Sequence, residues 1–160
     1  MRLLIAAVGR LKAGPERELL DRYVERANAA GRAVSLGPLE ISDIAESQDR
    51  RPQDRMADEA RKLEAAVPKG AKRIVLDGGG RALKSEDFAA RIAALRDQGA
   101  PGVVFLIGGA DGLDVKLKSE AEISISYGAA TFPHQIVRIL LAEQIYRAIT
   151  ILSGHPYHRA

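Results

Sequence analysis

Cysteine is absent from all 160 residues of the chain. A disulfide framework and a thiolate metal site are therefore excluded, and so is redox chemistry that uses a protein thiol. A chain without cysteine fits the reducing cytosol, and we expect a cytoplasmic protein.

Long apolar runs are also missing. The longest candidate, near the C-terminus, is interrupted by Arg138, Glu143 and Arg147, so no segment reaches the roughly 20 apolar residues that a membrane-spanning helix needs. The run Leu3–Val8 is shorter than the core of a signal peptide, and Gly9–Lys12 follows it without a cleavage pattern. We expect no membrane partner, and Leu3–Val8 is typical of a first strand.

Charge favours neither sign strongly. The 24 basic and 21 acidic residues give a formal net charge of +3, a mild preference for an anionic partner such as nucleic acid. A hydrophobic content of 46% in 160 residues predicts one globular domain over residues 1–160.

Short β-rich segments alternate with helical patterns along the chain. We predict strands at Arg2–Val8, Ala33–Ile41, Arg73–Asp77, Val103–Ile107 and Glu122–Tyr127. We predict helices from Pro15 to about Gly31, from Pro52 to the stop at Pro68-Lys69-Gly70, from an N-cap at Ser85, and over about Pro133–Ser153. This alternation predicts an α/β fold, with a mostly parallel sheet flanked by helices. The polar segment Ser42–Arg51 is predicted to be a mobile loop.

The last predicted helix carries apolar residues around most of its circumference. One core contact buries a single stripe of a helix, so a second burying surface is needed. A partner subunit would supply it, which predicts a dimer. The alternative is a central helix that its own domain covers. Glu143 and Arg147, four residues apart, are placed to form an ion pair.

Three segments rich in small residues follow predicted strands: Asp77–Gly80, Gly108–Gly112 and Tyr127–Phe132. In an open parallel sheet, ligands bind at such carboxyl-end loops. Neither glycine-rich turn, Asp77–Gly80 or Gly108–Gly112, matches G-x-G-x-x-G or a P-loop, so a dinucleotide or nucleoside triphosphate site of those types is not expected. The segments predict one pocket formed mostly by backbone, although Asp77–Gly80 alone can also be a plain loop.

All three histidines lie in the last thirty residues. His155, Tyr157, His158 and Arg159 follow a long apolar helix directly, where chains ordinarily end in small or charged residues. The absence of cysteine and the distance to His134 argue against zinc at these imidazoles, and we predict no metal site. No G-x-S-x-G elbow of a hydrolase occurs. Surface or capping duty remains the alternative for each histidine.

Several motifs together carry a resemblance that covers the chain. They are Val8-Gly9-Arg10-Leu11-Lys12, Tyr23-Val24-Glu25-Arg26, Leu76-Asp77 with Gly80, Ser85-Glu86-Asp87-Phe88-Ala89, Leu106 to Gly112, Thr131-Phe132-Pro133-His134 and Tyr157-His158-Arg159. With them the chain resembles the SPOUT-class methyltransferases that modify N3 of a pseudouridine in large-subunit (23S) ribosomal RNA. The resemblance implies an α/β fold with a C-terminal trefoil knot, S-adenosylmethionine held in that knot, and an obligate homodimer. Periodicity alone never predicts a knot, because threaded chains are rare.

The resemblance also implies the site residues. The cofactor site would comprise Leu76, Gly108, Tyr127, Gly128, Ala129, Ala130, Thr131 and Phe132. The family more often has a Leu-Ser-x-Met type of run where this chain has Tyr127–Ala130, which changes the shape of the pocket there. The acceptor side would be lined by catalytic His134, Arg138, His158 and Arg159, with His155 and Tyr157 binding substrate. The tail of one subunit would then lie beside the cofactor of the other.

The expected reaction moves a methyl group from S-adenosylmethionine to N3 of a pseudouridine in the helix 69 loop, on the large subunit or the assembled ribosome. Catalysis is mainly positioning, because the cofactor supplies the hard chemistry. The N3 proton must leave, which requires a base such as His134 or His158 with a neighbouring arginine. Two alternatives stay open: a knotted methyltransferase acting on another RNA such as transfer RNA, and a non-enzymatic α/β module that binds a nucleotide or a protein.

Overall fold

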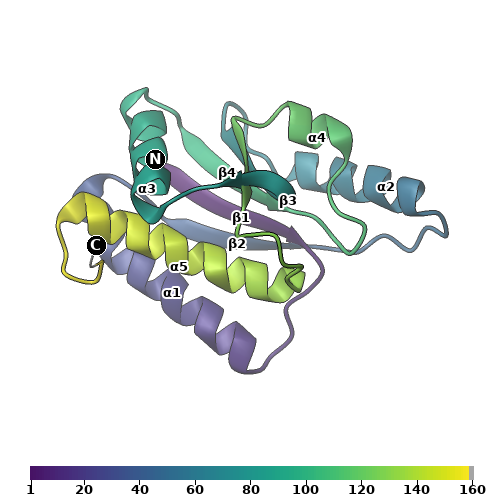
Figure 1. Cartoon of the computed structure of the whole chain (residues 1–160), viewed down its shortest axis with the longest axis horizontal. Helices are drawn as coiled ribbons and strands as arrows, with labels where there is room; N and C mark the ends of the chain where they lie inside the picture. Colours follow the sequence, from purple (N-terminus) through teal and green to yellow (C-terminus); the bar gives the residue numbers. More distant parts are fainter. Residues whose placement is uncertain (159–160) are drawn as a thin grey trace.

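The fold is built on a five-stranded sheet whose strands all pair in parallel, in the order β2-β1-β4-β3-β5. A computed structural model describes residues 1–158 (Figure 1). The strands are β1 Arg2–Val8, β2 Leu39–Ile44, β3 Lys72–Ala82, β4 Gly102–Ile107 and β5 Ile123–Ser126. All six residues of β4 are buried, as expected for a central strand covered on both faces. The predicted α/β class with a parallel sheet is confirmed.

Helices cover both faces of the sheet. They are α1 Pro15–Gly31, α2 Pro52–Ala65, α3 Ser85–Asp97, α4 Val115–Ser119 and α5 His134–Ser153, with a 3-10 turn at Arg32–Val34. Alternate residues of β1 divide between two cores: Leu3, Ile5 and Ala7 pack with α1, α3 and α5, whereas Ala6 and Val8 pack with α2 and α4. Figure 1 shows α5 alongside α1, with the α2 and α4 pair at the other side of the sheet.

The strand predicted at Ala33–Ile41 is wrong at its beginning. Residues 32–34 form the 3-10 turn, and Ser35 has a left-handed φ of 57°. The strand begins only at Leu39, whose N–H donates to Asn28 Oδ1 at 2.7 Å, and it continues to Ile44. The first part of the predicted loop Ser42–Arg51 is therefore strand. Further along, Ser47 is buried, and its N–H donates to Glu59 Oε1 at 3.0 Å.

The first glycine-rich segment is part of β3, contrary to the prediction that the strand ends at Asp77. The strand continues to Ala82 with a bulge, so that Ile125 of β5 pairs with both Leu76 and Arg81. A Cβ on Gly80 would lie 2.7 Å from backbone atoms of Ile125. Glycine is thus required where β3 passes β5.

Helix starts also differ from the prediction. Ser85 is the first residue of α3 and not its N-cap, and its hydroxyl donates to Gln144 Oε1 of α5 at 2.9 Å. The five-residue α4 was not predicted. Asp114 caps it by accepting from the N–H of Lys116 at 2.8 Å.

Most of the apolar surface of α5 is covered inside the chain, by α1, α3 and the sheet. α5 is thus a central helix covered by its own domain, which is the alternative to a dimer given above. Three large apolar side chains near α5 are still partly exposed to solvent: Phe132 just before α5 (40%), Ile136 on α5 (36%) and Leu19 on α1 (37%). No helix within residues 1–158 is long and apolar enough to cross a membrane.

Candidate functional site

A cavity of about 690 Å³ opens at the carboxyl edge of the sheet. Its walls come from the end of the regular part of β3, the turn after β4 and the segment between β5 and α5. All eight residues predicted to bind a cofactor line it: Leu76, Gly108, Tyr127, Gly128, Ala129, Ala130, Thr131 and Phe132. The structure therefore brings together the three segments that the sequence pointed to.

The turn after β4 is constrained by a hydrogen bond within it and by close packing around its glycines. The N–H of Gly112 donates to the carbonyl of Gly109 at 3.0 Å. A Cβ on Gly108 would lie 2.6 Å from the carbonyl oxygen of Gly112, and one on Gly109 would lie 2.8 Å from Glu59 Oε2. Both glycines are thus fixed by the packing of the turn, which leaves its backbone facing the cavity.

The segment after β5 is held by Ser126. Its hydroxyl donates to the carbonyl of Gly128 at 2.9 Å and accepts from the N–H of Gly128 at 3.2 Å. Gly128 has a φ of 129°, which favours glycine. Burial, with a smaller contribution from the negative charge of Glu143, raises the pKa of the Tyr127 phenol well above its usual value. The phenol therefore stays neutral in the wall of the cavity.

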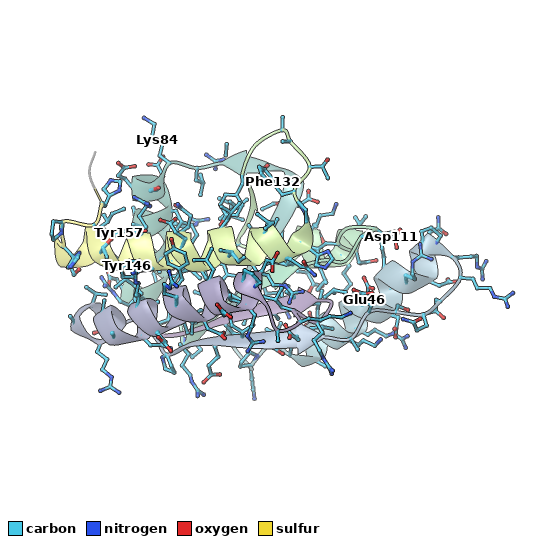
Figure 2. The ribbon with its side chains drawn as sticks, turned by 90° about the horizontal axis from the view of Figure 1, so that it is seen from below. Glu46, Lys84, Asp111, Phe132, Tyr146 and Tyr157 are labelled. Atoms are coloured by element: carbon cyan, nitrogen blue, oxygen red, sulfur yellow. The ribbon has the colours of Figure 1, made fainter. Side chains whose placement is uncertain are left out.

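His134 begins α5 and lines the cavity. Its Nε2 lies 3.1 Å from the position of a Cβ on Gly9, and Glu46 Oε1 lies 2.8 Å from the same position. An imidazole and a carboxylate thus converge on the end of β1. Glu46, labelled in Figure 2, was not singled out in the sequence because it lies in a polar segment that resembles an ordinary loop.

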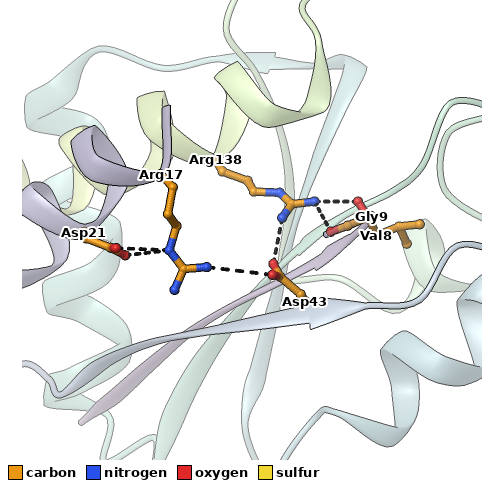
Figure 3. Close-up of polar contacts among 6 residues, drawn as sticks. All are labelled: Val8, Gly9, Arg17, Asp21, Asp43 and Arg138. Carbon is orange, nitrogen blue, oxygen red and sulfur yellow. Dashed lines mark hydrogen bonds and ion pairs between the residues drawn. The ribbon is translucent and has the colours of Figure 1, made fainter. Parts of the chain in front are cut away.

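Arg138 differs from its expected place on the acceptor side. Its side chain is fully buried, with Nη1 2.8 Å from Asp43 Oδ1 and Nη2 2.6 Å from the carbonyl oxygens of both Val8 and Gly9 (Figure 3). Arg17 extends this network from Asp43 toward Asp21. Burial lowers the pKa of the guanidinium, and the charge of Asp43 opposes that effect. In this arrangement Arg138 joins α5 to β1 and β2 and does not face a ligand.

The tail folds over the C-terminal half of α5. The Tyr157 hydroxyl donates to Glu143 Oε1 at 3.0 Å, and its ring lies 4.6 Å from that of Tyr146. Arg147 stacks on the Tyr157 ring at 4.9 Å and also forms the predicted ion pair with Glu143. His158 Nε2 lies 3.0 Å from Glu86 Oε1 on α3.

The cavity and the tail use different parts of α5: the first turn lines the cavity, and the tail contacts the helix from Glu143 onward. The cavity is lined by His134 at the start of the helix, and the tail returns beside its C-terminal half. Figure 2 shows Tyr146 and Tyr157 together at the C-terminal end. His155 is exposed there, and its Nδ1 accepts from the N–H of Tyr157 at 3.1 Å. Arg159, predicted to be catalytic, lies outside the described residues.

Sequence reasoning missed the link between α2 and the turn after β4. Arg55 of α2 forms a two-point ion pair with Asp111, which lies in that turn. The two residues are 56 positions apart, and only the folded chain brings them together. Within residues 1–158, no group of three or more histidine, aspartate or glutamate side chains could hold a metal ion.

Comparison with known proteins adds the family. Residues 1–158 match the family described as "Predicted SPOUT methyltransferase". Proteins named "Ribosomal RNA large subunit methyltransferase H" are similar over the full length of both chains, at 59% identity in Xanthobacter autotrophicus and 53% in Rhodopseudomonas palustris strain BisA53. A relative of the same name in Methylobacterium nodulans is 49% identical over 99% of this chain and 98% of its own.

Two solved structures share the fold. A probable methylase family protein from Haemophilus influenzae has a TM-score of 0.51 at 9% identity, over 99% of this chain and 70% of its own. A probable methyltransferase from Bordetella pertussis has a TM-score of 0.50 at 14% identity, over 92% of this chain and 95% of its own. At such identities they show the fold alone. The sequence match and the strand-end cavity agree: the chain belongs to the family of SPOUT methyltransferases.

Proposed function

We propose that this chain transfers a methyl group from S-adenosylmethionine to N3 of a pseudouridine in the helix 69 loop of 23S ribosomal RNA. The observation that carries the proposal is the cavity at the carboxyl edge of the sheet, in a chain 59% identical over its full length to a protein named as a ribosomal RNA methyltransferase. We also propose that the chain is knotted as its family implies, and that it acts in the cytoplasm.

The cavity suits the cofactor. Its volume of about 690 Å³ lies in the range of about 300 to 1,000 Å³ typical of small-molecule sites. Apolar side chains from three strand ends, Leu76, Ile107 and Ile125, can cover an adenine ring, while the glycine-rich backbone supplies N–H and C=O groups. The N-terminus of α5 lies in the wall and favours the negative carboxylate of the methionine moiety.

We propose that a second subunit completes the site. The tail folds back only as far as Glu143, nine residues after His134, which is about 14 Å along α5 at 1.5 Å per residue. Within residues 1–158 the tail does not line the cavity of its own chain, and Tyr157 and His158 would meet RNA beside the cavity of a partner. The exposed side chains Phe132, Ile136 and Leu19 are the apolar surface that such a dimer would bury.

The chain's own residues must then hold the base and take its proton. His134 lines the cavity and is a proton acceptor for N3, as is His158 of the partner subunit, and Arg159 of the partner subunit would stabilise the anion. S-adenosylmethionine, when bound, would supply the methyl group: the deprotonated N3 would form the bond to the methyl carbon as the carbon–sulfur bond breaks, which would leave S-adenosylhomocysteine. Arg138 supports this site without contacting the substrate, since its guanidinium donates to Asp43 and to the carbonyls of Val8 and Gly9.

The test is transfer of labelled methyl from S-adenosylmethionine to ribosomes purified from a strain that lacks this protein. Separate reactions contain isolated large subunits, assembled ribosomes and bulk transfer RNA, and mass spectrometry identifies the methylated base. The proposal predicts 3-methylpseudouridine in 23S ribosomal RNA and no label in transfer RNA. Label in transfer RNA would favour the alternative of a methyltransferase that acts on transfer RNA. Absence of transfer to all three would favour a binding module.

A further inference from the structure

Helix α2 contacts the turn after β4, most of which lines the proposed cofactor cavity. We propose that Arg55 and Glu59 of α2 are positioning residues: they hold the Gly108–Gly112 turn in the shape that binds cofactor, and so set cofactor affinity without touching the cofactor. This inference rests on the proposed function, because the cofactor is taken to be S-adenosylmethionine.

The first contact is the pair between Arg55 and Asp111. Arg55 Nε donates to Asp111 Oδ2 at 2.6 Å, and Nη2 donates to Oδ1 at 3.1 Å. Two parallel charge-assisted hydrogen bonds fix the orientation of a carboxylate more firmly than a single contact does. Each partner stabilises the charged form of the other: the hydrogen bond from Arg55 lowers the pKa of Asp111, and Asp111 raises the pKa of Arg55. Within residues 1–158, Asp111 is not among those that line the cavity.

Arg55 also holds the segment between β2 and α2. Its Nη1 donates to the main-chain carbonyls of Asp49 at 3.1 Å and Arg50 at 3.0 Å. One guanidinium therefore joins the segment between β2 and α2 to the turn after β4. The first of these segments carries Glu46, whose Oε1 converges on Gly9 together with Nε2 of His134, a residue of the cavity wall.

The second contact is Glu59, one helical turn after Arg55 and only 6% exposed. Its Oε1 accepts from the N–H of Ser47 at 3.0 Å. Its Oε2 has no hydrogen-bond partner in the described part of the chain, and a Cβ on Gly109 would lie only 2.8 Å from it. A buried carboxylate oxygen without a partner is costly. Oε2 lies against Gly109 without a hydrogen bond to it, so Glu59 supports the turn by packing, while the bond from Ser47 to Oε1 holds the carboxylate in place.

These contacts explain why the turn can be built from glycines and still have one shape. Flexible backbone ordered only on binding would lower cofactor affinity by the cost of ordering. Arg55 and Glu59 hold it from outside the cavity, which leaves the inner face free for the ligand.

The test compares Asp111→Ala with wild type in the full-length protein. Calorimetry with S-adenosylmethionine should show a dissociation constant raised about tenfold, while kcat at saturating cofactor changes less than about twofold, because the chemistry itself is untouched. Hydrogen exchange in the cofactor-free protein should be faster at residues 108–112. Asp111→Glu, which keeps the charge, should recover most of the affinity.

Two further variants separate positioning from general destabilisation. The double variant Arg55→Met with Asp111→Ala should bind no more weakly than Arg55→Met alone, since the loss of Arg55 already breaks its pair with Asp111. Arg61→Met is the matched control, because Arg61 pairs with Asp58 on the same helix and lines a different groove; its cofactor affinity should equal that of wild type.

The outcomes are distinct from those of the proposed function. If wild type binds S-adenosylmethionine and Asp111→Ala binds it equally well, the positioning role is wrong while the function stands. Equal losses for Asp111→Ala and Arg61→Met would also overturn it. If wild type itself does not bind the cofactor, the proposed function fails, and the exchange rates at residues 108–112 still report whether the pair orders the turn.

Discussion

The guanidinium of Arg138 on α5 donates to the carbonyl of Gly9 at the end of β1, with 2.6 Å between Nη2 and the oxygen. This bond holds the start of α5 against the end of β1. His134, the first residue of α5, lies beside Gly9 there. A residue that the sequence suggested for catalysis thus organises the site from within the protein.

Replacing Arg138 by methionine should lower the free energy of unfolding by about 3 kcal/mol, because Asp43 and the carbonyls of Val8 and Gly9 lose their buried donor. Urea denaturation measures the change. Arg17→Met is the control: Arg17 is 40% exposed, and its loss should cost less than about 1 kcal/mol. An Arg138→Met protein that is as stable as wild type but inactive would contradict this and support a catalytic role of Arg138 on the acceptor side.

Gly80→Ala should disrupt the crossing of β3 and β5, since a Cβ there would lie 2.7 Å from the backbone of Ile125. We expect a loss of about 3 kcal/mol or more, as for overpacking against rigid backbone. Gly78→Ala is the matched control, because a Cβ on Gly78 would meet no atom of residues 1–158 within 4 Å. Thermal denaturation of both variants checks this, and equal melting temperatures would show that the strands can separate without cost.

Tyr127 predicts a loss of stability at alkaline pH. Its pKa is raised in the folded state above the usual value of 10.0, so the unfolded chain releases the phenol proton first. The stabilisation is complete below about pH 10 and is lost as the pH rises toward the folded pKa. Unfolding free energies measured from about pH 9 to about pH 11.5 should therefore fall less steeply for Tyr127→Phe than for wild type. If the unfolding free energies of wild type and Tyr127→Phe fell equally with pH, the phenol of Tyr127 would be exposed to water in the folded protein and its pKa would not be raised.

Gly108→Val should abolish binding of S-adenosylmethionine while the rest of the chain stays folded. The first side-chain atom would lie 2.6 Å from the carbonyl oxygen of Gly112 and displace the turn. Calorimetry and circular dichroism together test this. Unchanged affinity in a folded Gly108→Val protein would remove the turn from the site.

The sequence predicted the parts of the fold that local patterns determine. The bounds of β1 and the start of α1 agree with the prediction, because an apolar run and a proline in the first helical turn are local signals. The segment before β2 was misassigned, since residues 32–34 form a 3-10 turn and the start of β2 is set by hydrogen bonds between Leu39 and Asn28, 11 positions earlier. For the site, strand-end glycines indicated the cavity.

The side chains that organise the site were beyond reach of local patterns. Arg138 is separated by 95 positions from Asp43, and Arg55 by 56 from Asp111. Each is an ordinary charged residue until folding brings its partner beside it. Burial reversed the expected role of Arg138, because nothing in the sequence distinguishes an arginine that faces a ligand from one that faces a strand end.

The most direct test of the whole account mixes two inactive proteins. One lacks residues 155–160, which should cost about 1 kcal/mol through the Tyr157 contacts and leave S-adenosylmethionine binding intact; the other carries Gly108→Val and keeps its tail. After subunits are exchanged, a mixed dimer joins the intact cavity of the first chain to the intact tail of the second. The account predicts that the mixture recovers methyl transfer to ribosomes although each protein alone has none. Continued inactivity of a mixture shown to contain mixed dimers, or full activity of the truncated protein alone, would contradict it.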